Sequence, residues 1–301
     1  MKVLVTGASG LLGAHIASGF AASHQVTGAD RNAWWGDRPL PFLKCDLNEP
    51  AEVRHAMAAT RPGAVIHCAG LADVDACERD PDRASIANVV LTRNLVSETP
   101  LSCLFVYIST DSVFSGDSRF WPEDHKPAPR NVYARSKLQG EEEVRKLRDH
   151  LIIRTNFYGW SSGRKKTSAE WLYRALAAGE AITLFEDFYF TPIYAPDLVR
   201  ILRTVIDRGA RGVLHLAGRD RVSKYSFGET MARLMGVSMK NVRRGSILES
   251  NLSATRSTDI SLNTQRARDL SGGDMPGCEE GLKRFLADKD RPLSRRWDAQ
   301  I

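Results

Sequence analysis

The sequence lacks the features that tie a chain to a membrane, a metal ion or an oxidising compartment. Its 301 residues contain no apolar run that approaches the ~18 residues of a transmembrane helix. The five cysteines are widely spaced and form no Cys-x-x-Cys pair or Cys/His cluster typical of zinc. Cys68 and Cys103 lie in apolar runs, which favours buried free thiols in a reducing cytoplasm. The chain opens on a strand-like run, so we expect no secretory signal.

The chain also lacks a concentrated positive patch. The net charge is +6, but it is dispersed over short clusters such as Arg164-Lys165-Lys166, Arg243-Arg244 and Arg295-Arg296. These clusters have no interleaved aromatic residues and no known nucleic-acid motif. They predict solvated surface or, alternatively, attraction of an anionic substrate or cofactor. Nucleic acid is therefore not an expected partner.

A glycine-rich turn stands at the start of the chain. Lys2–Val5 reads as a buried strand, and Thr6–Gly13 has the pattern Thr-Gly-x-x-Gly-x-x-Gly before an apolar helical pattern. Gly7 permits a tight turn, Gly10 lets the backbone approach a phosphate, and Gly13 lets helix and strand pack closely. The helix N-terminus would hold a dinucleotide pyrophosphate with free N–H groups and its dipole.

The second strand ends in a residue pair that leaves the choice of nucleotide open. Asp30 lies 17 residues after Gly13, where a carboxylate can bind the adenosine ribose hydroxyls and favours NAD. Arg31 favours NADP instead, because a guanidinium can pair with the 2′-phosphate. Alternatively, Asp30 and Arg31 are ordinary turn residues. The sequence therefore predicts NAD(P)H and does not decide between NAD and NADP.

Strand-like and helix-like segments alternate through the first half of the chain. The expected strands are Lys2–Thr6, Gln25–Ala29, Pro41–Leu43, Ala64–Cys68, Cys103–Ser109 and His150–Arg154. The expected helices are Leu11–Ser23, Pro50–Ala59, Arg83–Glu98 and Val132–Arg148. This rhythm predicts an α/β protein, a doubly wound parallel Rossmann sheet with a smaller C-terminal α/β substrate lobe. We expect residues 1–157 to bind the cofactor, completed by part of 193–217, and 158–301 to form mainly the lobe, with a mobile basic end after Arg291.

Three residues form a candidate catalytic group. Tyr133 and Lys137 are four residues apart at the start of a predicted helix, so both side chains lie on one face. A nearby ammonium lowers a tyrosine pKa, and the phenol can then exchange a proton with a hydroxyl or carbonyl oxygen. Thr110 follows an apolar strand, where its hydroxyl could hold the substrate oxygen. A surface Tyr–Lys pair is the competing interpretation.

These motifs together resemble the extended short-chain dehydrogenase/reductases. Ser109–Gly116 is similar to the Ser-Thr-Asp-x-Val-Phe-x-Gly stretch of the dTDP-4-dehydrorhamnose reductase branch, and Asn131–Glu141 is similar to that branch's catalytic helix. Val65–Gly70, Asp73–Glu78 with Asn88, and Gly212–Gly218 also fit the branch. The resemblance implies that Thr110, Tyr133 and Lys137 are the catalytic triad and that Tyr133 protonates the C4 oxygen of a 4-keto sugar nucleotide. It also implies that Asn88 steadies the site.

The sequence departs from this branch at two places. The branch has Arg-Thr-Ser-Trp-Val-Tyr-Gly after the sixth strand, whereas Arg154–Trp160 reads Arg-Thr-Asn-Phe-Tyr-Gly-Trp. This difference puts dTDP-4-dehydrorhamnose in doubt as the substrate. Related dehydratases carry Asp-Glu after the threonine, whereas Asp111 is followed by Ser112, which argues against water elimination.

The remaining candidates surround these motifs. Asp46 and Leu47 could lie near the adenine, although Asp46 or Asn48 would equally cap a helix that begins at Pro50. The predicted cofactor contacts are Gly7, Ser9, Gly10, Leu11, Leu12, Gly13, Asp30, Arg31, Asp46, Leu47, Cys68, Ala69, Gly70, Tyr133 and Lys137. The predicted substrate contacts are Leu71, Asp111, Asn156, Trp160, Thr191, Lys224 and Arg256. Lys224, Arg243 and Arg256 could pair with a nucleotide diphosphate or be solvated; Trp160 and Trp171 could stack on the substrate or fill the interface between lobes.

The expected function is therefore reduction of a nucleotide-activated 4-keto sugar in the cytoplasm. An epimerase of the same superfamily, which would keep its NAD bound, is one alternative. A non-catalytic regulatory subunit is the other, because the β-subunit of methionine adenosyltransferase resembles the same branch. The expected partner is a nucleotide sugar, with neither nucleic acid nor membrane, and a homodimer is left open.

Overall fold

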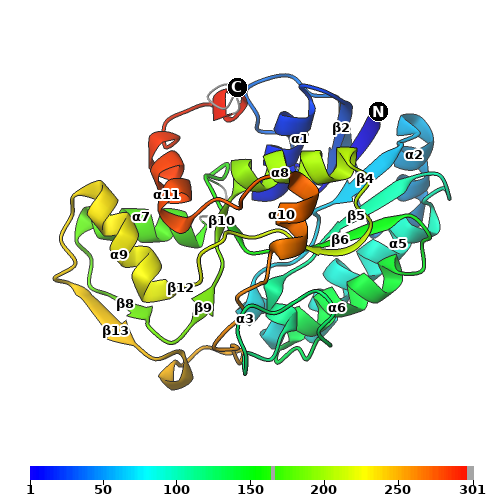
Figure 1. Ribbon diagram of the computed structural model, residues 1–301. Helices are drawn as coiled ribbons and strands as arrows, with labels where there is room; N and C mark the ends of the chain where they lie inside the picture. Colours follow the sequence, from blue (N-terminus) through cyan, green and yellow to red (C-terminus); the bar gives the residue numbers. More distant parts are fainter. Residues whose placement is uncertain (164–166, 297–301) are drawn as a thin grey trace.

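The computed structural model describes residues 1–163 and 167–296, and its core is one seven-stranded parallel sheet (Figure 1). The strand order is β11-β6-β5-β4-β1-β2-β3. The α/β prediction is therefore confirmed. The strands of this sheet are β1 (Lys2–Thr6), β2 (Gln25–Asp30), β3 (Phe42–Lys44), β4 (Ala64–His67), β5 (Leu104–Ile108), β6 (His150–Arg154) and β11 (Gly212–His215).

Helices cover both faces of this sheet because its strands are apolar on both sides. Val3 and Val5 pack toward α1 and α8, whereas Leu4 lies in the opposite core with residues of α2 and α5. The helices on the two faces are α1 (Leu11–Phe20), α8 (Ala195–Asp207) and α10 (Gln265–Ser271) on one, and α2 (Pro50–Thr60), α5 (Leu91–Ser97) and α6 (Val132–Val144) on the other (Figure 1). The strand order reverses between β1 and β4, and ligands bind at such switch points in open α/β sheets.

A second lobe stands beside the carboxyl ends of the strands, at the left of Figure 1. It has its own core, in which Leu172, Phe227 and Phe285 come from three different helices. Its elements are α7 (Ser168–Ala178), α9 (Lys224–Met235), α11 (Cys278–Ala287), β8 (Ile182–Phe185), β9 (Tyr189–Phe190), β12 (Val222–Ser223) and β13 (Val242–Gly245). The short pair β7 (Phe157–Tyr158) and β10 (Ile193–Tyr194) leads from the sheet toward this lobe.

One expected helix is present but contains an irregular turn. The expected helix Arg83–Glu98 consists of α4 (Pro81–Ser85), a π-helical turn (Ile86–Val90) and α5, and a further short helix, α3 (Val74–Arg79), precedes it. The π-helical turn places Asn88 where its side chain can bond to neighbouring segments, and such turns are frequent at functional sites.

The basic C-terminal end is fixed over the part that the structure describes. Leu293–Arg296 forms a 3₁₀ turn against α1, and the Ser294 amide donates to Asp37 Oδ1 at 2.9 Å. Arg296 is buried and donates to the Trp160 carbonyl at 3.2 Å. Mobility was therefore a wrong expectation for these residues, because the segment buries its arginine and bonds to two loops. Residues 297–301 and the cluster at 164–166 lie outside the described residues.

No helix within residues 1–163 and 167–296 is both long and apolar enough to cross a bilayer. The five cysteines are free thiols, and four of them are buried while Cys68 is partly exposed at the end of β4.

Candidate active site

The glycine turn after β1 lies against the loop after β4. Gly7 has a positive φ of 67°, and a Cβ at this position would stand 2.5 Å from the Ala69 nitrogen. A Cβ on Gly13 would overlap the Gly7 carbonyl. Glycine is thus required at both positions, once by conformation and close approach and once by helix–strand packing. The two loops meet at the switch point of the sheet.

Within the described residues 1–163 and 167–296, no side chain caps the N-terminus of α1. Gly10 occupies the N-cap without a capping side chain, and the first turn contains no acidic residue. Leu11, Leu12 and Gly13 form that first turn, so their amides point out of the helix start with its positive dipole end. The chain therefore fits a dinucleotide pyrophosphate at this position.

The ends of β2 and β3 offer both predicted means of recognising the adenosine ribose. Asp30 accepts hydrogen bonds from the amides of Ser9 at 3.1 Å and Asn32 at 3.0 Å, which fixes its carboxylate beside the glycine turn. Arg31 is exposed and lies 3.8 Å from Asp46. The structure thus places a carboxylate and a mobile cation side by side, and the choice between NAD and NADP stays open.

Two side-chain details near this edge differ from the sequence interpretation or were missed by it. The N-cap of α2 is Glu49, not Asp46 or Asn48; Asp46 instead accepts from the Asn48 amide. Leu47 is buried, and its carbonyl accepts from Asn94. Trp35 donates its indole N–H to the Ser9 carbonyl at 3.0 Å and closes one side of the glycine turn.

Tyr133 and Lys137 project from one face of α6, as their spacing predicts. Asn131 caps this helix by accepting from the Ala134 amide at 2.9 Å. The Lys137 ammonium donates to the Ile108 carbonyl at 2.8 Å and lies 4.0 Å from the centre of the Tyr107 ring. These contacts fix the lysine at the carboxyl end of β5, next to Thr110.

The pKa of Tyr133 moves in the direction opposite to the sequence prediction. Desolvation raises it to about 12, even though a hydrogen bond with Thr110 acts to lower it. Lys137 does not contribute, because its ammonium is directed to the β5 carbonyl. The protein without cofactor therefore keeps Tyr133 protonated, which is the form that donates a proton.

A buried ion pair under the site was not found by sequence reasoning. Glu141 follows Lys137 by one helical turn and is fully buried. It accepts from Ser109 at 2.6 Å and from Arg154 at 3.0 and 2.8 Å. Burial lowers the pKa of Lys137 to about 8, and the Glu141 carboxylate opposes this change. The i,i+4 spacing of Lys137 and Glu141 was the available sequence signal.

Asn88 joins two parts of the site. Its amide oxygen accepts from the Leu71 amide at 2.8 Å, and its nitrogen donates to the Leu71 carbonyl and to Ser136 on α6. It therefore fixes the loop after β4, including Gly70, to the helix that carries Tyr133. His67 is also a structural residue, bonded at Thr6 and Thr92.

Three of the predicted substrate contacts meet next to Thr110. Asp111 is 1% exposed and accepts from Asn156 at 2.7 Å and from Thr110 at 3.2 Å. Lys224, at the start of α9, faces Asp111 from the lobe, and its charge lowers the carboxyl pKa against a larger effect of burial, which raises it to about 6. The sheet and the lobe thus contribute opposite charges to one place.

The other predicted substrate residues lie deeper or elsewhere. Trp160 stacks on Phe285 with ring centres 4.3 Å apart and donates to its carbonyl, so the indole fills the lobe core. Thr191 is buried and accepts from the Leu262 amide. Arg256 is paired with Asp75 at 2.8 Å. Arg243 and Trp171 are exposed, on β13 and α7.

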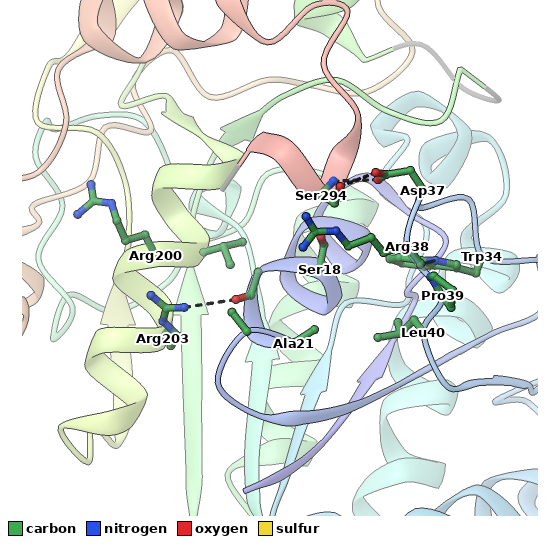
Figure 2. A pocket seen from close by; sticks show the side chains of 13 residues that line it. Ser18, Ala21, Trp34, Asp37, Arg38, Pro39, Leu40, Arg200, Arg203 and Ser294 are labelled. Atoms are coloured by element: carbon green, nitrogen blue, oxygen red, sulfur yellow. Dashed lines mark hydrogen bonds between the residues drawn. The ribbon is translucent and has the colours of Figure 1, made fainter. Parts of the chain in front are cut away.

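Two cavities lie away from the predicted substrate contacts. A cavity of about 380 Å³ lies between α1, α8 and the loop after β2, where Arg203 donates to the Gly19 carbonyl and Ser294 contacts Asp37. Figure 2 shows the side chains that line it. None of the predicted site residues lines it. A second cavity of about 680 Å³ includes Arg31 and Asp46 at the β3 edge.

The glycine turn after β1 and the Tyr-x-x-x-Lys helix beside it define an extended short-chain dehydrogenase/reductase. Residues 1–291 match the RmlD substrate binding domain family, and the chain belongs to that family.

Individual proteins are similar to the chain over most of its length. A "probable low-salt glycan biosynthesis reductase" of Haloferax volcanii is 30% identical over 94% of this chain and 96% of its own. Methionine adenosyltransferase 2 subunit beta of Danio rerio is 31% identical over 74% and 71%. The structure of dTDP-4-dehydrorhamnose reductase from Bacillus anthracis in complex with NADP has a TM-score of 0.85 and 28% identity, covering 96% of this chain and 100% of that one.

Proposed function

We propose that this protein is an NAD(P)H-dependent reductase of a nucleotide-activated 4-keto sugar. The observation that carries the proposal is the position of Thr110, Tyr133 and Lys137 at the strand ends next to the Gly7–Gly13 turn. A solved structure of similar fold is a dTDP-4-dehydrorhamnose reductase with NADP, which supports both the cofactor and the substrate class.

The residues divide the chemistry as follows. Bound NAD(P)H supplies a hydride to the carbonyl carbon. Thr110 donates a hydrogen bond that orients the carbonyl oxygen, and Tyr133 transfers its phenolic proton to that oxygen. Because the pKa of Tyr133 is raised to about 12, the proton is present at neutral pH before the reaction. Lys137, whose ammonium keeps further N–H donors beside its bond to the Ile108 carbonyl, would hold the nicotinamide ribose.

Elimination of water does not fit this site. The dehydratase pattern needs a second carboxylic acid after Asp111, and Ser112 stands there with its hydroxyl donating to Asp111. A serine hydroxyl is too weak a base to remove a proton from carbon at neutral pH. The protein therefore reduces its keto sugar without first dehydrating it.

A panel of dTDP-, UDP- and GDP-linked 4-keto-6-deoxyhexoses, offered with NADPH and with NADH, tests this function. We expect one molecule of NADPH or NADH to be oxidised for each molecule of sugar reduced. The product should be a 4-hydroxy sugar, identified by NMR. A protein that purifies with tightly bound NAD and interconverts sugars without added cofactor would instead be the epimerase.

The similarity to methionine adenosyltransferase 2 subunit beta supports a second candidate, a regulatory subunit. Such a subunit does not need a complete proton-transfer group, whereas Thr110, Tyr133 and Lys137 are all present here, and Tyr133 is hydrogen-bonded to Thr110. Failure to reduce any sugar of the panel, together with a stable complex with a purified methionine adenosyltransferase, would favour the regulatory role.

A further inference from the structure

Lys224 occupies a position that the local structure does not explain. It is the first residue of α9, where the positive end of the helix dipole disfavours a cation. Ser223 already caps the helix by accepting from the Ser226 amide at 3.0 Å. The helix therefore gains nothing from an ammonium at this position.

The ammonium of Lys224 also has no anionic partner in direct contact. It lies 3.5 Å from the centre of the Phe190 ring and 5.3 Å from that of Phe188, two aromatic residues of the lobe. Over residues 1–163 and 167–296 it forms no ion pair and donates no hydrogen bond. The side chain is partly buried, and this burial lowers its pKa to about 8. The N–H groups of this ammonium therefore have no acceptor among the described residues.

Asp111 faces this space from the sheet side. Its carboxylate is held by Asn156, Thr110 and Ser112, so its position is fixed by three donors. Lys224 and Asp111 influence each other's ionisation, yet they do not approach within ion-pair distance. The donor and the acceptor thus lie near each other without forming a direct ion pair.

We propose that a hydroxyl of the sugar bridges Lys224 and Asp111, accepting from the ammonium and donating to the carboxylate. A hydroxyl can do both at once, whereas a phosphate would be repelled by Asp111. The inference rests on the proposed function, because it locates the reacting carbonyl at Thr110. The Thr110 hydroxyl lies 3.2 Å from the Asp111 carboxylate, so the hydroxyl that Asp111 binds is on a ring carbon next to C4. C5 of a 6-deoxyhexopyranose carries no hydroxyl, which leaves the hydroxyl at C3.

This arrangement makes Lys224 a specificity-determining residue and joins the lobe to the sheet through the substrate. A site built around a hydroxyl rejects an analogue that lacks it, because a buried donor and acceptor are then left unpaired. The enzyme should therefore discriminate strongly between a C3-hydroxy sugar and its 3-deoxy counterpart.

The test compares a dTDP-4-keto-6-deoxyhexose with its 3-deoxy analogue in wild type, Lys224→Met and Asp111→Asn. Wild type should prefer the hydroxylated sugar by at least about 100-fold in kcat/KM, and Lys224→Met should reduce this preference to about tenfold or less. The loss should come from the hydroxylated substrate, with the rate on the 3-deoxy sugar unchanged. Asp111→Asn should reduce the preference in the same direction.

Lys240→Met is the matched control, since Lys240 is exposed at the end of the same lobe segment. A wild-type preference retained in Lys224→Met would overturn the inference, as would an equal loss on both sugars. If wild type reduces neither sugar, the proposed function fails. Calorimetric binding of dTDP-linked 6-deoxyhexoses with and without the C3 hydroxyl then decides the inference, which stands only if Lys224→Met abolishes the difference in affinity.

Discussion

At the scale of single residues, burial decides which protonation states the site holds. Tyr133 keeps its proton because the folded chain desolvates the phenol, while Lys137 is directed to a backbone carbonyl. A Tyr–Lys spacing alone predicts a lowered tyrosine pKa, because it takes account of the charge and not of the burial. A protonated Tyr133 is the form that the proposed reduction requires.

Tyr133→Phe removes the phenolic hydroxyl, which is the proposed proton donor, and keeps the aromatic ring. We expect kcat to fall by about 10²–10⁴-fold with the affinity for NADPH unchanged, because the phenyl ring still fills the same volume. Steady-state kinetics and fluorescence titration of NADPH measure the two quantities. Tyr173→Phe, in the lobe, is the control and should retain activity. Normal turnover in Tyr133→Phe would refute the acid role.

Asp30→Ala tests the choice of nucleotide at the end of β2. The carboxylate disfavours a 2′-phosphate by repulsion, so its removal should raise the ratio of kcat/KM for NADPH over NADH by about tenfold or more. The exposed Arg31 guanidinium, 3.8 Å from Asp46, can then pair with the phosphate. Asp290→Ala, an exposed carboxylate, is the control for net charge. An unchanged ratio would mean that Asp30 does not face the ribose.

At the scale of elements, α6 is the part on which the site depends. It carries Tyr133, Lys137 and Glu141, and it lies close to β5 because Gly140 has no side chain. A Cβ at Gly140 would overlap the hydroxyl of Tyr107, which is fully buried on β5. The distance between this helix and the strand ends is therefore set by one glycine.

Gly140→Ala should displace α6 from β5 and destabilise the folded protein. We expect a loss of about 1–3 kcal/mol in the free energy of unfolding, as for other overpacked positions, and a lower kcat because Lys137 moves with the helix. Urea denaturation and steady-state kinetics measure these effects. Glu142→Ala, exposed on the same helix, should change neither. An unaltered stability in Gly140→Ala would show that β5 and α6 can separate without cost.

At the scale of the whole molecule, ionisable groups are buried where the sheet domain and the lobe meet. Burial lowers the pKa of Lys224 to about 8 and raises that of Asp111 to about 6. Both pKa shifts mean that folding disfavours the charged forms of Lys224 and Asp111. Burial of these charges therefore costs free energy, and a bound substrate that pairs with them can offset this cost. Stability and function oppose each other at this interface.

The pH dependence of stability should reveal this opposition. Between pH 8 and about 10, folded Lys224 has lost its proton while the unfolded chain, with a pKa near 10.5, retains it. Lys224 therefore adds stability as the pH rises through this window, by up to about 1.4 kcal/mol per pH unit. Lys224→Met should lack this increment.

Denaturation curves of wild type and Lys224→Met at pH 7 to 10 measure the difference. Buried cysteines and tyrosines have raised pKa values and act in the opposite direction, but they are common to both proteins and cancel in the comparison. Lys240→Met should run parallel to wild type. Parallel curves for Lys224→Met as well would show that Lys224 is fully solvated in the folded protein.

The sequence alone predicted the features that depend on neighbours along the chain. The glycine turn, the alternation of strands and helices and the Tyr133–Lys137 spacing are local, and β1 and β6 have the predicted bounds. The helix expected at Arg83–Glu98 is present, but the sequence did not predict the π-helical turn Ile86–Val90 within it. Asn88 in this turn bonds to Leu71 and Ser136, which are distant in sequence.

Only the tertiary structure decided what surrounds each reactive group. It placed Glu141 and Arg154 under the site, reversed the expected pKa shift of Tyr133, and brought Lys224 opposite Asp111 across 113 positions of the chain. Desolvation and charge pairing depend on distances in space, which spacing along the chain does not encode. The sequence thus determined the glycine turn and the Tyr133–Lys137 pair, whereas packing determined their protonation and which charged side chains surround them.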